Sequence, residues 1–380
     1  MHAATLWTRT TTFNNNRGLS DPCRSPNCGI TISDSTKYLR GTGRQRWTPR
    51  WSRRDEDSIP PQPAICFRPR AAISSIFHMA SQISRRTLLG AAVCLRAAHA
   101  SPPPPPRLKV SIFSKHLNFL AGDDLAAAAG RIGFDGVDLT VRKGGHVEPE
   151  RVRQDLPPLV ATIRRHGLEV PMITTDIADA QTPHAEEILQ TMQDLGIPDY
   201  RWLGFRYDPA RPYPAQLDEI KRRIAPLAAL NSRHRACAMY HTHSGRNLVG
   251  ASIWDLYILL KDFDPKAVGV NYDVAHATVE GGLGGWIDSY RIATPYIRGL
   301  AVKDFAWGKD PKGEWQPLWA PLGQGMVRFP EFFAMVKGSG FSGPVQMHFE
   351  YSMPEAREEV YAAMKRDLGQ LRGYLEKAGL

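Results

Sequence analysis

The chain has 380 residues, of which 42% are hydrophobic and 23% are charged, and its formal net charge is +10. Residues 1–100 hold 15 Lys and Arg against 5 Asp and Glu, which leaves 33 of each sign in residues 101–380. Because this larger part is neutral, it lacks the basic surface of a nucleic-acid-binding protein, and we expect no nucleic-acid partner.

The first hundred residues have the features of a processed leader. Ser84–Leu89 matches the twin-arginine export pattern, and Ala98–Ala100 places small residues where a signal peptidase would cleave. The apolar stretch between them is too short to span a bilayer, so we expect no stable membrane anchor. We interpret 1–78 as a disordered leader or a mis-called start, 79–100 as a signal peptide and 101–106 as a proline-rich spacer. The sequence therefore predicts a periplasmic or otherwise exported protein.

After Arg107, short apolar or β-branched segments alternate with longer amphipathic ones. The short segments predict strands at residues 108–114, 136–141, 170–176, 200–207, 236–243, 267–273, 297–304 and 344–351. The longer segments predict helices at residues 123–132, 149–166, 183–195, 214–230, 252–261, 285–294, 329–340 and 354–378. Such alternation predicts an α/β fold, a closed (β/α)8 TIM barrel in residues 107–380. An open doubly wound sheet is disfavoured, because no glycine-rich phosphate loop follows the first strand.

Polar residues gather at the carboxyl ends of the predicted strands, where the active sites of such barrels lie. Imidazoles and carboxylates end the fifth, sixth and eighth strands: His241, His243, Asp273, His276, His348 and Glu350. These groups suit a divalent metal ion such as Mn²⁺, Co²⁺, Zn²⁺ or Fe²⁺, which could polarise a carbonyl and stabilise an enediolate. His348 shares its strand parity with Glu350, so the two side chains are expected to face the same way.

Other polar and aromatic residues lie near the same rim. Lys303, at the end of the seventh strand, either holds a substrate oxygen or forms a structural ion pair with Glu350. Lys115 and Arg206 are candidate anchors for a carboxylate or phosphate, although each alone is also typical of a solvated surface charge. Trp307 lies in the predicted loop after the seventh strand and is a candidate platform for a sugar ring.

Five segments resemble motifs of the xylose-isomerase-like superfamily of sugar isomerases, epimerases and dehydratases. In chain order they are Tyr240–His243, Asp273–His276, Val302–Asp304, Pro321–Gly325 and His348–Tyr351. The resemblance implies a metal ion held by Glu, Asp, His and Glu from strands five to eight. Asp273 and Glu350 occupy the second and fourth places, and His241 stands at the first.

At the third place of this ligand set, Ala301 replaces the histidine of the family motif. Either His276 or His243 turns inward to supply the missing ligand, or the metal site is weakened or lost. The same replacement favours the alternative function of a metal-free or non-catalytic sugar-binding barrel.

Residues and resemblance together predict a metal-assisted isomerase, epimerase or dehydratase-type lyase that acts on a sugar, keto-sugar or cyclitol. His241, Asp273 and Glu350 would bind the metal ion. Glu350 or His276 would remove a proton next to a carbonyl, and Lys303 would hold or protonate an oxygen. The expected substrate contacts are Lys115, Arg206, His243 and Trp307. The sequence leaves open the substrate, the metal and whether the protein forms a homo-oligomer.

Overall fold

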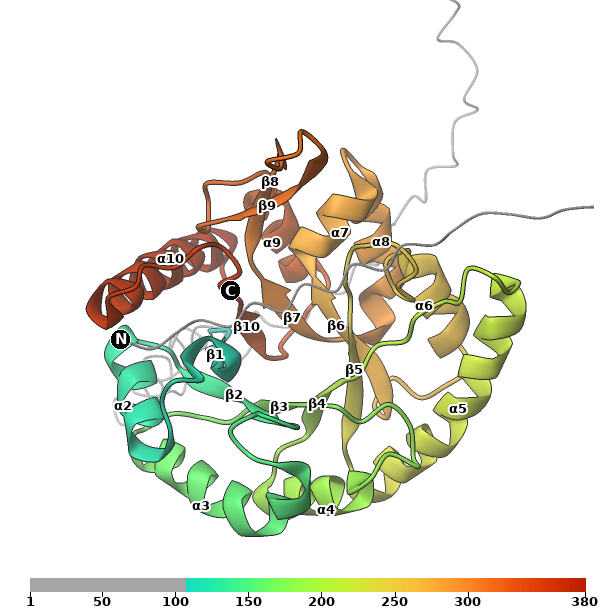
Figure 1. Cartoon of the computed structure of the whole chain (residues 1–380), viewed down its shortest axis with the longest axis horizontal. Helices are drawn as coiled ribbons and strands as arrows, with labels where there is room; N and C mark the ends of the chain where they lie inside the picture. Colours follow the sequence, from blue (N-terminus) through green and yellow to red (C-terminus); the bar gives the residue numbers. More distant parts are fainter. Residues whose placement is uncertain (1–106) are drawn as a thin grey trace, which may run out of the picture. The chain divides into compact units, whose positions relative to one another are not determined.

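The computed structural model describes residues 107–380, so the predicted leader, signal peptide and spacer lie outside the described residues and stay predictions. Eight parallel strands close into a barrel in the order β1-β10-β7-β6-β5-β4-β3-β2, with helices around them (Figure 1). The prediction of a (β/α)8 barrel is therefore confirmed. The barrel strands are β1 (Val110–Phe113), β2 (Gly136–Val141), β3 (Met172–Thr175), β4 (Asp199–Trp202), β5 (Cys237–His241), β6 (Val268–Asp273), β7 (Ile297–Val302) and β10 (Val345–Met347).

The surrounding helices bury one apolar face each against the strands. They are α2 (Gly122–Ile132), α3 (Val152–Arg165), α4 (Ala185–Leu195), α5 (Tyr213–His234), α6 (Ile253–Leu260), α7 (Val274–Gly281), α8 (Gly285–Ala293), α9 (Phe329–Gly338) and α10 (Arg357–Ala378), with short 3-10 turns η1 (Ser114–Leu117), η2 (Pro149–Arg151) and η3 (Thr294–Tyr296). In α2, Leu125, Ala129 and Ile132 are buried at helical spacing. The helix ends at Gly133, whose φ of 108° is a left-handed conformation that favours glycine. None of the helices in residues 107–380 combines the length and apolarity needed to cross a bilayer.

The interior of the barrel changes from apolar to polar along the strands. Met172, Cys237 and Met239 form a small apolar cluster of their own. One layer further on, the Asn271 amide donates a 2.8 Å hydrogen bond to Gln346 Oε1. Gly299 makes room for this pair, because a Cβ there would lie 2.9 Å from Asn271 Oδ1. The next inward-facing residues of these strands, Asp273 after Asn271 and His348 after Gln346, are also polar, so the barrel interior is polar at the carboxyl ends.

The chain departs from the predicted elements at the rim. An antiparallel hairpin of β8 (Asp304–Lys309) and β9 (Trp315–Ala320) replaces the predicted loop and projects from the barrel (Figure 1). Helix α7 follows β6 directly, where no helix was expected, and β5 ends at His241 rather than at His243. The hairpin was missed because Trp307, Pro317 and the turn between the strands break a simple alternating pattern.

Asp304 fixes the path of the chain on both sides of this hairpin. Its carboxylate accepts backbone hydrogen bonds from Phe305, Gly323, Gly325 and Val327 at 2.9–3.2 Å. A Cβ at Gly325 would lie 2.2 Å from Asp304 Oδ1, so only glycine allows this close approach. The acidic residue and the glycine-containing segment after the hairpin thus form one structural unit.

We expect Asp304→Ala to lower the free energy of unfolding by about 2–4 kcal/mol, because buried backbone N–H groups lose their acceptor. Asp304→Asn is the matched control, since it keeps one acceptor oxygen and should cost less. Denaturant unfolding followed by circular dichroism measures both. A loss below about 0.5 kcal/mol for Asp304→Ala would show that the carboxylate does not hold the segment.

Candidate functional site

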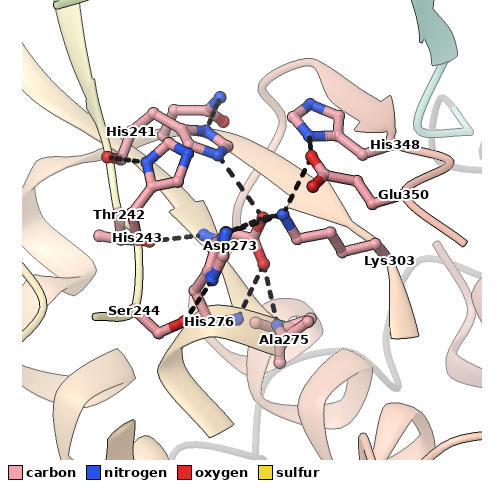
Figure 2. Close-up of polar contacts among 12 residues, drawn as sticks. His241, Thr242, His243, Ser244, Asp273, Ala275, His276, Lys303, His348 and Glu350 are labelled. Carbon is pink, nitrogen blue, oxygen red and sulfur yellow. Dashed lines mark hydrogen bonds and ion pairs between the residues drawn. The ribbon is translucent and has the colours of Figure 1, made fainter. Parts of the chain in front are cut away.

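The polar side chains at the carboxyl ends of β5, β6, β7 and β10 converge on one point (Figure 2). His241 and Asp273 are the last residues of β5 and β6, and Lys303 directly follows β7. His348 and Glu350 lie just beyond β10, while His276 stands in the first turn of α7. Apart from Glu350, whose side chain is 28% exposed, these side chains are buried.

Asp273 lies at the centre of this cluster and is fully buried. Its Oδ1 accepts 3.0 Å hydrogen bonds from the backbone N–H groups of Ala275 and His276, which caps α7. Its Oδ2 lies 3.5 Å from His241 Nε2 and 3.3 Å from Lys303 Nζ. Burial alone would raise the pKa of Asp273, but the positive charge of Lys303 and the nearby imidazoles lower it to about 2. The carboxylate is therefore ionised at neutral pH.

Lys303 and His276 form a hydrogen-bonded pair beside Asp273. Lys303 Nζ lies 2.7 Å from His276 Nε2, and His276 Nδ1 lies 2.8 Å from Ser244 Oγ. Burial, together with Lys303, lowers the pKa of His276 to about 4, against the opposite effect of Asp273. The neutral imidazole thus accepts from Lys303 and donates to Ser244. Trp319 of the hairpin covers the pair, with Lys303 Nζ 4.4 Å from its ring centroid.

Three donor atoms in the cluster have no hydrogen-bond partner within the described part of the chain. They are His241 Nε2, Asp273 Oδ2 and His348 Nδ1, all buried, although Asp273 Oδ2 also forms an ion pair with Lys303 Nζ. His241, Asp273 and His348 can each offer one ligand atom within 4.8 Å of the other two. Burial lowers the pKa of both histidines far below the ordinary value, so both imidazoles are neutral, the form that ligates metals. Unpaired buried polar atoms are costly, and their convergence is typical of a cation site. This group could hold a divalent metal ion.

A second group of His241, His243 and His276 has ligand atoms equally close together. It is the weaker candidate, because both ring nitrogens of His276 already have partners in Lys303 and Ser244. His243 interacts differently from His241, since its Nε2 lies 3.4 Å from the guanidinium of Arg201. The Asp273-containing group also provides a negative charge, which favours a divalent cation.

Ala301 lies at the place of the family motif's histidine, and the adjacent strand brings the imidazole of His348 near it. Ala301 is aligned with Asp273 on one side and with Gln346 on the other. His348 lies two positions beyond Gln346 and stacks on His241, with ring centroids 5.2 Å apart. The sequence analysis included His348 among the groups that suit a metal ion but not in the predicted ligand set, because a position on one strand does not reveal which side chain of a neighbouring strand lies next to it.

Glu350 lies at the edge of the cluster rather than among the three unpaired donors. Its Oε1 is 3.4 Å from Lys303 Nζ and 3.9 Å from His348 Nδ1. Figure 2 shows its carboxylate beside the lysine, on the side of His348. The three metal ligands predicted from the sequence therefore separate into His241 and Asp273 inside the group and Glu350 next to it.

Asn271 supports His241 from the layer below. Asn271 Nδ2 lies 3.0 Å from His241 Nδ1, and Asn271 Oδ1 has no partner within residues 107–380. If this amide were turned by 180°, with Gln346 turned in concert, Asn271 Oδ1 would accept a hydrogen bond from the Nδ1–H group of His241. That arrangement leaves the Nε2 lone pair of His241 facing Asp273, as a metal ligand requires.

Lys115, Arg206 and Trp307 do not join the cluster by any contact in the described region. Lys115 is exposed in η1, and Arg206 is exposed beyond the end of β4. Trp307 is 41% exposed on the hairpin, whereas Trp319 of β9 covers Lys303. The roles predicted for these three residues stay predictions. The arginine that does reach the cluster is Arg201, which strict alternation within β4 would have placed on the inner face.

Two cavities differ in their relation to this chemistry. One of about 230 Å³ opens beside His243 and His276, under α7 and α8. A larger one of about 1080 Å³ is lined by residues at the strand starts, such as Lys109, Pro198 and Arg298. Only the smaller cavity touches the cluster, through His243 and His276, and none of the proposed metal ligands lines it.

Comparison with known proteins identifies the family. Residues 125–368 match the family described as the xylose isomerase-like TIM barrel. The chain belongs to this family. A search among curated proteins gives no significant match.

Solved structures share the fold at low sequence identity. A xylose isomerase domain protein from Planctomyces limnophilus is 18% identical, with a TM-score of 0.53 over 72% of this chain and 98% of that one. D-psicose 3-epimerase from Clostridium cellulolyticum H10 is 11% identical, with a TM-score of 0.54 over 70% and 99%. The 3-keto-D-glucoside 4-epimerase of E. coli is 14% identical, with a TM-score of 0.51 over 70% and 100%.

Across the barrel from Asp273, the buried carboxyl of Asp138 has a strongly shifted pKa. Both of its oxygens lie 3.0 Å from the hydroxyl of Thr174. Burial raises the pKa of Asp138 to about 7, against the opposite effects of Thr174, Arg201 and Arg142. The carboxyl is thus close to half protonated at neutral pH.

The folded chain binds this proton more tightly than the unfolded chain, so protonation of Asp138 stabilises the fold at low pH. This contribution to the free energy of unfolding is lost as the pH rises through about 7. Asp138→Asn does not titrate, so we expect its stability advantage over the wild type to grow by about 2–3 kcal/mol between pH 5 and pH 8. Denaturant unfolding at several pH values measures the difference. A difference that does not change with pH would show that Asp138 has an ordinary pKa.

Proposed function

We propose that this protein is a metal-dependent isomerase, epimerase or dehydratase-type lyase that acts on a sugar, keto-sugar or cyclitol. The proposal rests on one observation above all: His241, Asp273 and His348 bring three buried ligand atoms that make no hydrogen bond together beside Lys303 and Glu350, at the carboxyl end of the barrel. The shared fold with sugar epimerases supports the choice of substrate class. The twin-arginine pattern further leads us to propose that the protein is exported.

His241, Asp273 and His348 are the proposed metal ligands. Two neutral imidazoles and one carboxylate suit Mn²⁺, Co²⁺, Zn²⁺ or Fe²⁺ better than a hard ion that prefers only oxygen. When bound, such an ion would polarise a carbonyl or hydroxyl oxygen of the substrate. This assignment differs from the set predicted by the resemblance, because His348 takes a ligand place and Glu350 is free for another role.

Glu350 is the better candidate for the base that removes the carbon-bound proton. It lies at the edge of the cluster and is partly exposed, so a substrate can reach its carboxylate. His276 is less suited, because its Nε2 lone pair accepts from Lys303 and burial lowers its pKa to about 4. The proton would pass to a Glu350 oxygen while the C–H electron pair moves toward the adjacent carbonyl.

Lys303 is placed to stabilise the charge that develops on that carbonyl oxygen. Its Nζ already contacts Asp273, Glu350 and His276, so it is held in position by several partners. A preoriented cation in a buried site stabilises a developing oxyanion more than a mobile one in water. The next step distinguishes the three reactions. An isomerase returns the proton to the adjacent carbon, an epimerase returns it to the opposite face of the same carbon, and a lyase expels a hydroxyl group instead.

We expect the purified full chain to hold about one equivalent of Mn, Co, Zn or Fe after dialysis against metal-free buffer, measured by plasma mass spectrometry. Asp273→Asn and His348→Ala should lose the metal without unfolding, whereas Asp288→Asn on the exposed surface of α8 is the matched control. Chains that bind D-fructose or D-tagatose but take up no metal, even on reconstitution, would instead indicate a sugar-binding barrel.

One variant distinguishes a role of Glu350 as the base from a role in metal binding. Glu350→Gln should keep the metal and abolish the exchange of a carbon-bound proton for deuterium, followed by NMR with D-fructose or D-tagatose in D₂O. Loss of metal in this variant would return Glu350 to the ligand set and contradict its assignment as the base.

Asn271 should tune metal affinity without touching the metal. We expect Asn271→Leu to weaken binding about 10- to 100-fold, because His241 loses the partner that fixes its tautomer. Asn271→Asp should retain affinity, because a carboxylate can accept from His241 Nδ1. Chelator competition measures both dissociation constants, and an unchanged value for Asn271→Leu would show that the amide has no such role.

A further inference from the structure

Arg201 brings a guanidinium group into the mouth of the barrel. It lies on β4, opposite Thr174 of β3. Its Nη2 is 3.4 Å from His243 Nε2, and its Cζ is 5.7 Å from the centroid of the Phe113 ring. The guanidinium group of Arg201 therefore lies next to the proposed metal site, with the ring of His243 between it and His241.

Arg142, just beyond β2, approaches the same aromatic ring. Its Cζ lies 5.8 Å from the Phe113 centroid. The Phe113 ring in turn lies 4.9 Å from the ring of His348, centroid to centroid. Two guanidinium groups thus meet at one ring, and this ring contacts a proposed metal ligand. The two arginines border the proposed site along both His243 and Phe113.

Neither of these two guanidinium groups forms an ion pair within the described part of the chain. Within residues 107–380, no carboxylate forms an ion pair with either side chain, whereas Arg298 and Arg372 pair with Asp199 and Asp135. Asp138 on β2 interacts electrostatically with both arginines, but its two oxygens lie 3.0 Å from the Thr174 hydroxyl and form no ion pair with either guanidinium group in the described region. Partly buried guanidinium groups without a counter-charge are energetically unfavourable unless an anion joins them.

We propose that the substrate carries an anionic oxygen group, a carboxylate or a phosphate, which Arg201 and Arg142 bind beside Phe113. This inference rests on the proposed function and narrows its substrate class to sugar acids, keto acids or sugar phosphates. Guanidinium groups match the planar geometry of carboxylate and phosphate oxygens through paired N–H donors. The two arginines would hold the anionic end of the substrate. The reacting carbon, one or more bonds away from that end, would then face Glu350 and Lys303.

The test compares three ligands that share a six-carbon skeleton: D-gluconate, D-glucose 6-phosphate and D-glucose. Isothermal titration of the full chain, both loaded with Mn²⁺ and treated with EDTA, gives their dissociation constants. We expect at least one anion to bind about tenfold or more tightly than D-glucose. A preference for D-gluconate identifies the carboxylate as the natural group, and a preference for D-glucose 6-phosphate identifies the phosphate.

Arg201→Met and, separately, Arg142→Gln should reduce this preference to about twofold or less while leaving the Mn²⁺ affinity intact. Arg201→Lys keeps the charge and should retain part of the preference if Arg201→Met folds poorly. Arg153→Gln, on the outer surface of α3, is the matched control and should behave as the wild type.

Equal binding of the three ligands, or no binding of either anion, would overturn the inference. So would an anion preference that survives in both arginine variants. These outcomes are distinct from failure of the proposed function, which is read from the metal content. A chain without metal that still prefers an anion in an arginine-dependent way would retain the subsite and lose the metal-dependent chemistry.

Discussion

The site depends on the two oxygens of Asp273, which face different partners. Oδ1 caps α7, so the helix begins immediately after β6 and carries His276 back over the barrel mouth. Oδ2 faces His241, Lys303 and the region of the unpaired donors. Because the cap fixes the carboxylate plane, the position of Oδ2 is set by the backbone rather than by a flexible side chain. The same bond that starts the helix therefore orients the central charge of the site.

Lys303 explains how this arrangement is stable before any metal ion binds. A fully buried carboxylate beside neutral imidazoles would otherwise become protonated, but the nearby ammonium group keeps the pKa of Asp273 at about 2. Lys303 also has His276 and Glu350 as partners, so it can lose part of its interaction with Asp273 without being left unpaired. A resident cation of this kind preserves the charge state that a divalent ion requires.

The repeating part of the fold could be predicted from the sequence, whereas the contacts between strands could not. Each strand–helix repeat is visible locally, since buried strands and amphipathic helices have different hydrophobic periods. The hairpin of β8 and β9 has no such period, and the prediction of a loop there concealed that Trp319, rather than Trp307, covers Lys303. Likewise, the sequence shows that Ala301 lacks an imidazole, but only the alignment of β7 with β10 shows that His348 lies beside the gap. Arg206 was chosen over Arg201 because the fourth strand was expected to continue to residue 207, and it ends at Trp202.

The proposed metal ligands and the two arginines come from different sides of the barrel mouth, and this arrangement constrains how a substrate can lie. The proposed metal ligands and Glu350 come from β5, β6 and the end of β10, whereas Arg142 and Arg201 come from β2 and β4. His243 and Phe113 lie between the two sides. His243 contacts Arg201 and His241. Phe113 contacts Arg201 and His348. A neutral sugar would satisfy only the first half and leave two guanidinium groups without an anion in a partly buried site. A substrate with an acidic group at one end and a hydroxyl or carbonyl a few bonds away would engage both halves at once, and its length would place the reacting carbon next to Glu350.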